Sequence, residues 1–581
     1  MRYPTLKEMK TSREMLDVFK GYNHNLRIGN GEFYEMENLS PDHYPVLSPR
    51  AQRGVYASPG NPQGLVAKDA LCYVDGGDFV IGEYHIPMGL TVDDKPKKLI
   101  SMGAYVIIMP DKKYINTENY EDRGNIEAYV STTSQVSFSL CQVDGAEYGE
   151  VPSQATPPES PANMALWIDT SSTPHTLKQY SETMASWSAI ATTYIRISAN
   201  GIGKPFSVND GVTISGVADA ALADLNASTV IWAKGDNYIV VKGILDKVTN
   251  QDTPITVERR MPLMDLDLII ESGNRLWGCN YGFARNGEVV NEIYASKLGD
   301  FKNWSCFVGI STDSYAASVG TDGQFTGAIT HLGYPIFFKE TCMHKVYGNY
   351  PANFQIQTTP CRGVQKGCHR SLAIVNETLY YKSRSGVCAY DGSLPAEVSA
   401  ALGDAVYQNA AAGSLGNKYY ISMADTDGGW HLFVYDTVKG MWHREDDTQA
   451  DDFCACRGDL YFINHATNQI QTVKGTGEKD VKPIKWSATT GIFGTDSPDK
   501  KYISRMDVRM KLDVGARVSF FAEYDSSGEY YHLFTMTGKS LQSFSVPFRT
   551  RRCDHMRLRI IGTGDVKIFS ICKTIEWGSD L

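Results

Sequence analysis

Acidic residues are the first candidates for chemistry in this chain, because paired carboxylates can act as general acid and general base. Glu445, Asp446 and Asp447 are consecutive, and Asp265 and Asp267 are two residues apart. Glycoside hydrolysis needs two carboxylates about 5 to 10 Å apart across a cleft, one of them with a raised pKa. The sequence singles out no such pair, and acids at solvated loop ends explain these residues more simply. We therefore assign no catalytic carboxylate.

A metal site is the second possibility, because cysteine and histidine are zinc ligands. Cys361, Cys368 and His369 lie together in PCRGVQKGCHR. Structural zinc sites place cysteines two to four residues apart and usually bring a second pair. The two cysteines here are seven residues apart and no second pair follows. We expect no metal ligand set.

A phosphate-binding loop would need Gly-x4-Gly-Lys-Ser/Thr. The segment ANGIGKPFS has Gly203 and Lys204, but Pro205 follows them and Ser198 stands where the first glycine should be. The pattern therefore fails, and we expect no cofactor-binding residue.

Two enzyme motifs typical of other folds are also missing or incomplete. SKLGDFKNW, from Ser296 to Trp304, contains the aspartate and tryptophan of a sialidase Asp-box, but in the wrong spacing and only once. We expect it to form a turn that packs Trp304. Gly-x-Ser-x-Gly, the nucleophile elbow, is absent.

We expect Arg275 to bind backbone carbonyls or a neighbouring subunit's acids while the indole of Trp277 packs. With no catalytic, cofactor-binding or metal residue assigned, the chain is predicted not to be an enzyme.

Composition and charge indicate a soluble protein rich in β-strands. The 581 residues include 33 Tyr, 22 Phe, 9 Trp and 52 Gly, and aromatic strands separated by glycine-rich turns are typical of all-β proteins. The net charge of -10 argues against a dedicated nucleic-acid binder. No apolar run approaches the roughly 20 residues of a membrane span, and the N-terminus lacks a secretory signal. The 12 cysteines are expected to be buried free thiols.

A hairpin recurs along the chain. Five aromatic strands have anchors at Leu276, Ile336, Tyr380, Tyr420 and Tyr461, with spacings of 60, 44, 40 and 41 residues. A period of about 40 residues with four short strands per unit predicts a β-propeller, although alternation alone also allows a sandwich or barrel. Two upstream hairpins, near Cys72 and Tyr105, bring the number of blades to six or seven.

The breaks in this period divide the chain. Proline-rich sequence between 150 and 164 cannot join a central strand, and longer alternating runs follow residue 475. We predict an all-β protein: a six- or seven-bladed propeller with an inserted small β domain and a C-terminal β-sandwich. The predicted boundaries are 1–55 for an N-terminal arm, 56–117 for the first part of the propeller, 118–262 for the inserted domain, 263–475 for the second part of the propeller, and 476–581 for the sandwich.

The N-terminal arm contains the segment GEFYEMENLSPDHYPVLSPR, from Gly31 to Arg50. Phe33, Met36 and Leu39 can anchor it, while its prolines prevent a helix. Two interpretations stay open: an extended arm that docks on the propeller or on a neighbouring subunit, and a strand that closes the propeller by pairing with the last blade. Helix is expected only in SREMLDVFKG and in LADLN.

Several segments resemble tail proteins of tailed bacteriophages and prophages, specifically the nozzle, hub or tubular propeller proteins of short-tailed phages. The segments that carry the resemblance are GEFYEMENLSPDHYPVLSPR, ERRMPLMDLDLIIESGNRLWGC, VNEIYASKLGDFKNW, GYPIFFKE and CRGVQKGCHRSLAIVNETLYYKSRSGVCAYDG. The resemblance implies a non-enzymatic structural virion protein. It implies a homo-oligomeric ring, typically of six subunits, that extends the head–tail connector and surrounds the DNA exit channel.

The same resemblance implies the partners and the location. The ring would contact an adaptor above it and fibre or plug proteins below it, and DNA would pass without specific binding, which a negative charge suits. It would be assembled in the bacterial cytoplasm and reside in the virion tail, with no membrane span. The alternative is a tail-associated propeller that binds or hydrolyses glycans; a third possibility is an adaptor in a long-tailed particle.

Overall fold

The computed structural model describes residues 11–93, 95–127, 129–260, 263–283, 287–479, 482–494, 499–547 and 551–577. Strands dominate this part of the chain. Its helical elements are four 3-10 turns: η1 Pro41–His43, η2 Ala220–Leu225, η3 Pro351–Asn353 and η4 Ala400–Leu402. Within the same residues, no helix has the length and apolar character to cross a membrane.

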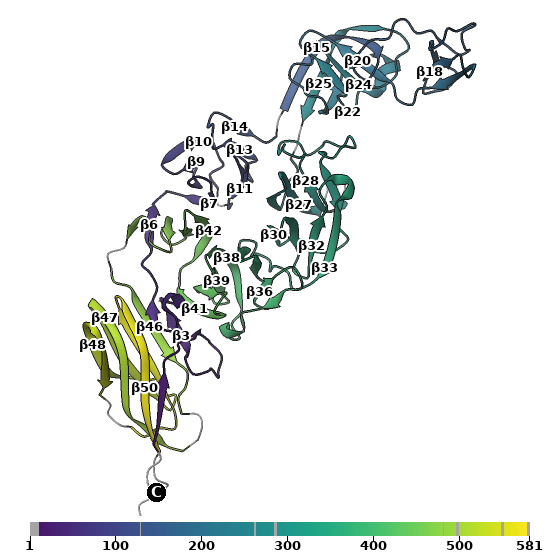
Figure 1. Ribbon diagram of the computed structural model, residues 1–581. Coiled ribbons are helices and arrows are strands. Elements are labelled where there is room, and N and C mark those ends of the chain that lie inside the picture. The colour runs from purple at the N-terminus through teal and green to yellow at the C-terminus, as the bar shows by residue number, and fades with distance from the viewer. Residues whose placement is uncertain are drawn as a thin grey trace, which may run out of the picture.

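Seven blades form the propeller (Figure 1). Five are separate four-stranded sheets, the sixth is part of a twelve-stranded sheet, and the seventh is a five-stranded sheet. Blade one comprises β7 Pro62–Ala67, β8 Leu71–Asp75, β9 Asp78–Ile81 and β10 Tyr84–Pro87. Blade two comprises β11 Lys98–Met102, β12 Tyr105–Met109, β13 Lys113–Asn116 and β14 Arg123–Asn125. Blade three comprises β26 Leu268–Ser272, β27 Arg275–Phe283, β28 Val289–Ala295 and β29 Tyr315–Ser318. Blade four comprises β30 Gly327–His331, β31 Tyr334–Phe338, β32 Cys342–Tyr347 and β33 Gln355–Pro360.

The remaining blades follow the same plan. Blade five comprises β34 Ala373–Val375, β35 Thr378–Lys382, β36 Val387–Tyr390 and β37 Ala396–Glu397. Blade six comprises β38 Tyr407–Leu415, β39 Lys418–Asp425, β40 Trp430–Asp436 and β41 Met441–Asp446. Blade seven comprises β42 Ala450–Cys456, β43 Asp459–Asn464, β44 Gln469–Thr472 and β6 Gly54–Ala57, with β45 Glu478–Lys479 beside β6. The two upstream hairpins are therefore two blades, and the propeller has seven.

The predicted repeat has a simple structural basis. All five anchor residues, Leu276, Ile336, Tyr380, Tyr420 and Tyr461, lie on the second strand of their blades and are at most 7% exposed. This strand lies in the interior of its blade, and the neighbouring blades pack against both of its faces. Aromatic and aliphatic side chains fit such a strand.

The ring of blades is closed by a strand from far upstream. β6 lies between β44 and β45, with Val55 opposite Gln471, so the N-terminal part of the chain completes the last blade. The innermost strands of blades seven and one, β42 and β7, are in contact. Closure buries facing apolar side chains of blades seven and one in a common core, which an open array would expose.

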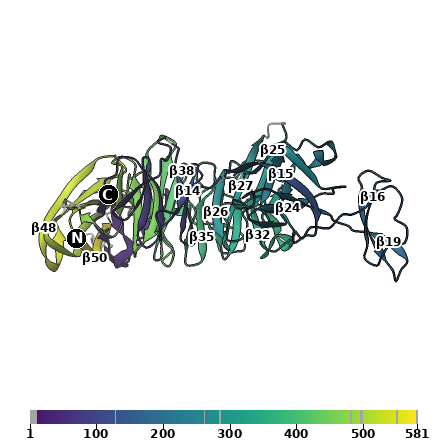
Figure 2. The ribbon, with the colours of Figure 1, turned by 90° about the horizontal axis from the view of Figure 1, so that it is seen from above.

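The inserted domain connects blades two and three. Its main sheet has the order β22-β21-β25-β15-β20-β24-β23, and a second sheet, β16–β19, forms a tip (Figures 1 and 2). The main-sheet strands are β15 Tyr129–Cys141, β20 Tyr194–Ser198, β21 Gly211–Ser215, β22 Ser228–Val230, β23 Ala233–Gly235, β24 Tyr238–Lys242 and β25 Thr249–Arg260. The tip strands are β16 Ser153–Gln154, β17 Leu166–Asp169, β18 Thr176–Ser181 and β19 Ser186–Ala189. The domain has its own apolar core, which includes Phe138, Ile197 and Val257.

The C-terminal region forms the predicted sandwich around two long, bent strands. Its strands are β46 Lys485–Thr490, β47 Lys501–Tyr524, β48 Tyr530–Val546, β49 Met556–Thr563 and β50 Val566–Trp577. The first half of β47 pairs with β50 and the second half pairs with β49. One strand thus contributes to both layers.

The N-terminal arm docks on the propeller, as the first interpretation has it, and also builds part of the sandwich. The arm forms β1 Thr11–Leu16, β2 Gly21–Tyr22, β3 Glu32–Glu37, β4 Leu39–Ser40 and β5 Ser48–Pro49. β1 pairs with β50 and β3 pairs with β46, so the arm belongs to the sandwich, while β2 joins β3 to β41 of blade six. One twelve-stranded sheet therefore runs from the sandwich into the propeller. Closure of the ring falls to β6, whose first residues, Gly54 and Val55, are the end of the predicted arm, so the second interpretation holds for that end.

The helix expected at SREMLDVFKG is wrong. Residues Thr11 to Leu16 form an edge strand, with Thr11, Arg13 and Met15 exposed on one face. Backbone pairing with β50 outweighs the local helix preference, which is a weak force on its own.

Phe33, Met36 and Leu39 anchor the arm as predicted, since each is at most 1% exposed. They lie in a core that also contains Trp442 of blade six and Trp486 of the sandwich. Burying a phenylalanine or methionine side chain contributes roughly 1.5–3 kcal/mol. Apolar packing therefore joins the propeller and the sandwich in addition to the shared sheet.

Candidate functional site

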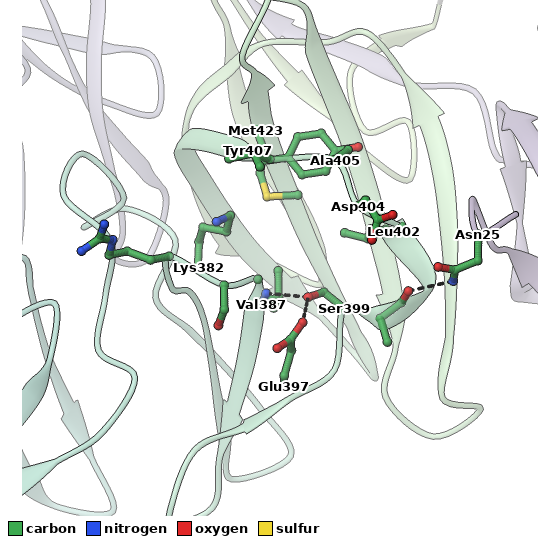
Figure 3. Close-up of a pocket in the computed structure, with 16 residues that line it drawn as sticks. Asn25, Lys382, Val387, Glu397, Ser399, Leu402, Asp404, Ala405, Tyr407 and Met423 are labelled. Atoms are coloured by element: carbon green, nitrogen blue, oxygen red, sulfur yellow. Dashed lines mark hydrogen bonds between the residues drawn. The ribbon is translucent and has the colours of Figure 1, made fainter.

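A polar hollow of about 410 Å³ lies between blades five and six (Figure 3). The loops 384–386 and 403–406 supply much of its wall, with residues of β36, β37, η4 and β38 beside them, and Asn25 reaches it from the N-terminal arm. The side-chain amide of Asn25 donates to the carbonyl oxygen of Ala400 at 2.9 Å. The arm thus fixes the rim of this hollow.

Glu397 is the carboxylate most firmly held in the hollow. Its Oε2 accepts from Nη1 of Arg362 at 2.7 Å, and its Oε1 accepts from Oγ of Ser399 at 3.4 Å. Ser399 in turn accepts from the backbone N–H of Val387 at 2.9 Å (Figure 3). Gly386 makes this approach possible, because a Cβ there would lie 2.1 Å from the Ser399 hydroxyl and its φ is +154°.

Lys382 is a buried cation at the same site, with 2% exposure. Its Nζ donates to Oε1 of Gln365 at 2.8 Å and to the carbonyl oxygen of Ser383 at 2.5 Å. Burial lowers the pKa of this ammonium group. Neutral oxygens bind this ammonium group directly. The charged side chains of the lining are balanced, with Lys382 and Arg384 against Glu397 and Asp404.

The acidic cluster 445–447 has a structural role in this fold. Arg53 donates to Oε2 of Glu445 at 2.7 Å and pairs with Oδ2 of Asp446 at 2.8 Å, and Arg50 pairs with Asp446 at 3.4 Å. Burial alone would raise the pKa of Asp446, but the charges of Arg53 and Arg50 outweigh it and lower the pKa to about 2. Asp447 pairs with Arg444 on the surface. These two arginines precede β6, so the ion pairs hold the closing strand against blade six.

The second acidic pair is also separated by the fold. Asp265 has a 98% exposed side chain and pairs with Nζ of Lys112 at 3.0 Å. Asp267 accepts from the backbone N–H of Tyr281 at 2.8 Å, and burial raises its pKa. Neither acid lies in the hollow described above.

The structure also places the weaker candidates. Cys368 is buried and Cys361 is half-buried, and no three His, Cys, Asp or Glu side chains gather into a metal site among the described residues. All twelve cysteines are free, as expected.

Trp304 is buried, with its indole N–H donating to the carbonyl oxygen of Phe301 at 2.8 Å, so the turn prediction is confirmed. Arg275 binds the carbonyl oxygens of Ser296 and Ser311, as predicted.

Sequence reasoning did not find Asn25, Lys382 or Ser399. They come from the arm and from two parts of blade five, and no short motif joins them. The available signal was in LYYKSRSG. A lysine at the end of a buried strand needs hydrogen-bond acceptors for its ammonium group, and this points to a polar site near Lys382.

The comparisons with known proteins give the fold its context. No protein-family model matches the chain, and no curated protein matches it. Among solved structures, an exo-β-1,3-galactanase from Phanerochaete chrysosporium shares 10% identity over 52% of this chain and 94% of its own, with a TM-score of 0.23. A family 43 arabinoxylan arabinofuranohydrolase from Bacillus subtilis shares 7% identity over 53% and 94%, with a TM-score of 0.20. A puromycin hydrolase shares 12% identity over 71% and 61%, with a TM-score of 0.19.

These neighbours correct one prediction. The expectation that the chain is not an enzyme is contradicted, because the matching structures include glycoside hydrolases. The absence of familiar motifs was too weak a ground for that exclusion, since one fold hosts many functions and a site is recognised by its geometry. At such low identities and TM-scores the activities of these neighbours are not carried over to this chain.

Proposed function

We propose that the chain is a structural protein of a bacteriophage tail, a nozzle or hub subunit that assembles into a ring around the DNA exit channel. The supporting observation is the twelve-stranded sheet that joins blade six to the sandwich through the N-terminal arm. A ring that transmits force between a connector and distal tail parts needs subunits whose domains do not hinge freely. The shared sheet and the common apolar core meet this need.

The proposal includes partners and a location. Six copies would form the ring, an adaptor or connector would lie above it, and fibre or plug proteins would lie below it. The protein would be assembled in the cytoplasm of a bacterial host and reside in the virion tail. DNA would pass without specific binding, which agrees with the net charge of -10.

The mass of the purified protein in solution, with and without its upstream tail partner, tests this proposal. We expect a species near six subunits, formed alone or on addition of the partner. A stable monomer that ignores the partner, together with absence of the chain from purified particles, would overturn it.

A glycan-binding role is the second candidate, and one feature of the inserted domain favours it. On the tip sheet, the rings of Trp187 and Trp167 are 5.3 Å apart and those of Trp187 and Tyr180 are 5.4 Å apart. Trp187 and Tyr180 are half-buried. Trp167 is buried, and its indole N–H donates to the carbonyl oxygen of Gln154. A rigid aromatic surface of this kind can stack on the apolar face of a sugar ring.

Binding of host cell-wall oligosaccharides distinguishes this candidate. If it is correct, Trp187→Ala weakens binding at least tenfold, whereas Trp577→Ala in the distant sandwich leaves it unchanged. Binding that survives Trp187→Ala would reject the tip as the glycan site.

A further inference from the structure

Charge is unevenly distributed along the chain. Residues 482–581, which supply most of the sandwich, contain 16 Lys and Arg and 11 Asp and Glu, a net charge of +5. Residues 129–260, the inserted domain, contain 8 Lys and Arg and 13 Asp and Glu, a net charge of -5. The two domains lie at opposite ends of an elongated molecule, with the propeller between them (Figure 1). The rest of the chain contains 32 Lys and Arg and 42 Asp and Glu, a net charge of -10. The sandwich end is therefore positive, and the remainder of the molecule, including the insert, is negative.

Part of this positive charge lies on one sheet face of the sandwich. The basic face consists of Arg13 on β1, Arg505, Arg509 and Lys511 on β47, and Lys567 on β50. Arg13 and Arg505 both lie opposite Thr574, on either side of β50. Arg505, Arg509 and Lys511 are exposed at alternate positions of β47, so they share one face.

One pairing on the basic face is unfavourable in the isolated chain. Lys511 lies directly opposite Lys567, and like charges in this arrangement destabilise a sheet. The nearest carboxylate of Lys511 is that of Asp513 at 3.7 Å, with both side chains about half exposed. Asp507, the other acid on this face of β47, is already bound by Arg505 at 2.9 Å, by Arg13 at 3.6 Å and by Ser545. The face thus retains positive charge that an acidic partner could neutralise.

The opposite end carries exposed acids. Glu159 and Glu182 lie on the tip sheet's loops, and Glu150 lies just before β16. Each is exposed, and none forms an ion pair within the described part of the chain. The tip therefore presents carboxylates whose charge is uncompensated.

We propose that the basic face of the sandwich binds the acidic inserted domain of a second copy, head to tail. The contact joins two different surfaces, so it is heterologous and repeats from copy to copy, closing into a ring or continuing as a filament according to the angle between copies. A second copy is favoured over nucleic acid, because the remaining 481 residues outside 482–581 carry -15 and repel a polyanion. The inference rests on the proposed function only in its expectation of self-association.

Sedimentation of the full chain at low and high salt, with charge-reversed variants, tests the contact. We expect wild type to associate at about 0.05 M salt and to dissociate at about 0.5 M, where screening shortens the Debye length. Arg509→Glu/Lys567→Glu alone and Glu159→Lys/Glu182→Lys alone should each weaken association at least tenfold. Mixing the two variants should restore it, because an acidic sandwich then meets a basic tip. Lys366→Glu, an exposed change on the propeller, is the matched control and should behave as wild type.

Three results would overturn the inference. They are a wild type that stays monomeric at low salt, an association that neither variant weakens, and a mixture that fails to recover. Binding of a short DNA duplex that the Arg509→Glu/Lys567→Glu variant alone loses, without any self-association, would assign the face to nucleic acid instead. A chain that associates through these faces but is absent from tail particles would reject the proposed function and leave this contact standing.

Discussion

At the scale of single residues, the most consequential side chains in this molecule hold it together. Arg53 is 11% exposed in its side chain and binds two acids that are 5% and 20% exposed. A buried ion pair contributes little when it is compared with an apolar replacement, but removing one partner leaves the other charge unpaired. Glu445 and Asp446, which invite a catalytic interpretation in the sequence, are therefore best tested as structural residues.

Replacing Arg53 with methionine should lower the free energy of unfolding by about 3–5 kcal/mol, because two buried carboxylates lose their main cation. The urea midpoint of the full chain measures this. Arg123→Met, which removes an exposed guanidinium that binds only the carbonyl oxygen of Tyr120, should shift the midpoint little. Equal midpoints for the two variants would show that the arginine clamp does not stabilise the fold.

The same cluster predicts how stability depends on pH. The pKa of Asp446 is lowered to about 2 in the folded protein, so the unfolded chain binds a proton at this group at higher pH than the folded chain does. Its contribution is fully present above the ordinary aspartate pKa and is lost as pH falls toward 2. Urea midpoints between pH 5 and pH 2.5 should therefore fall less steeply for Asp446→Asn than for wild type. A parallel decline in both would contradict the assignment.

At the scale of elements, the closing strand β6 and the arm determine the architecture. β6 has neighbours on both sides: Gly54 and Val55 pair with both β44 and β45, and Ala57 pairs with β44. Residues 54–57 carry no strong strand signal, since GVYA is short, begins with glycine and is closely followed by Pro59 and Gly60. Tertiary pairing at the edge of blade seven decides their conformation.

Val55→Pro should open the propeller between blades seven and one, because proline removes a backbone N–H and cannot occupy a central strand without loss. Limited proteolysis should then cut near residues 58–61 much faster than in wild type. Val55→Ala keeps the N–H and is the matched control. If Val55→Pro resists protease as wild type does, β6 does not close the ring.

At the scale of the whole molecule, the inserted domain and the sandwich are attached in different ways. The first and last residues of the insert, Tyr129 and Arg260, lie opposite each other on paired strands. The insert also has an apolar core of its own. The sandwich shares a sheet and an apolar core with blade six. The insert should therefore be an independent unit, and the sandwich should not be.

Replacing residues 129–260 with a short glycine–serine linker should leave the propeller and sandwich folded, with a thermal midpoint close to that of wild type. Deleting residues 482–581 should instead lower the midpoint strongly, since it exposes Phe33, Met36 and the free edge of β3. Circular dichroism melts of both deletions measure the difference. A loss of the native spectrum in the first deletion would show that the insert is required for folding.

The sequence alone was sufficient for the repeating part of the fold. The spacing from Leu276 to Tyr461 predicted blades because each anchor lies on a strand buried on both faces, which demands the same residue types every time. Phe33, Met36 and Leu39 were likewise recognisable as buried, and the cysteines as free thiols.

Only the tertiary structure decided where the arm goes, which strand closes the ring and which residues form the hollow. The local sequence of β1 favours a helix. The segment forms a strand because it pairs with the edge of β50, which lies more than 500 residues away in the sequence. Asn25, Lys382 and Ser399 meet because a strand from the start of the chain packs on blade six. Local sequence patterns indicate which residues are buried and where the chain turns, because these features depend largely on residues that are close in the sequence. Contacts between distant segments depend on backbone pairing and shape, and these arise only when the whole chain is folded.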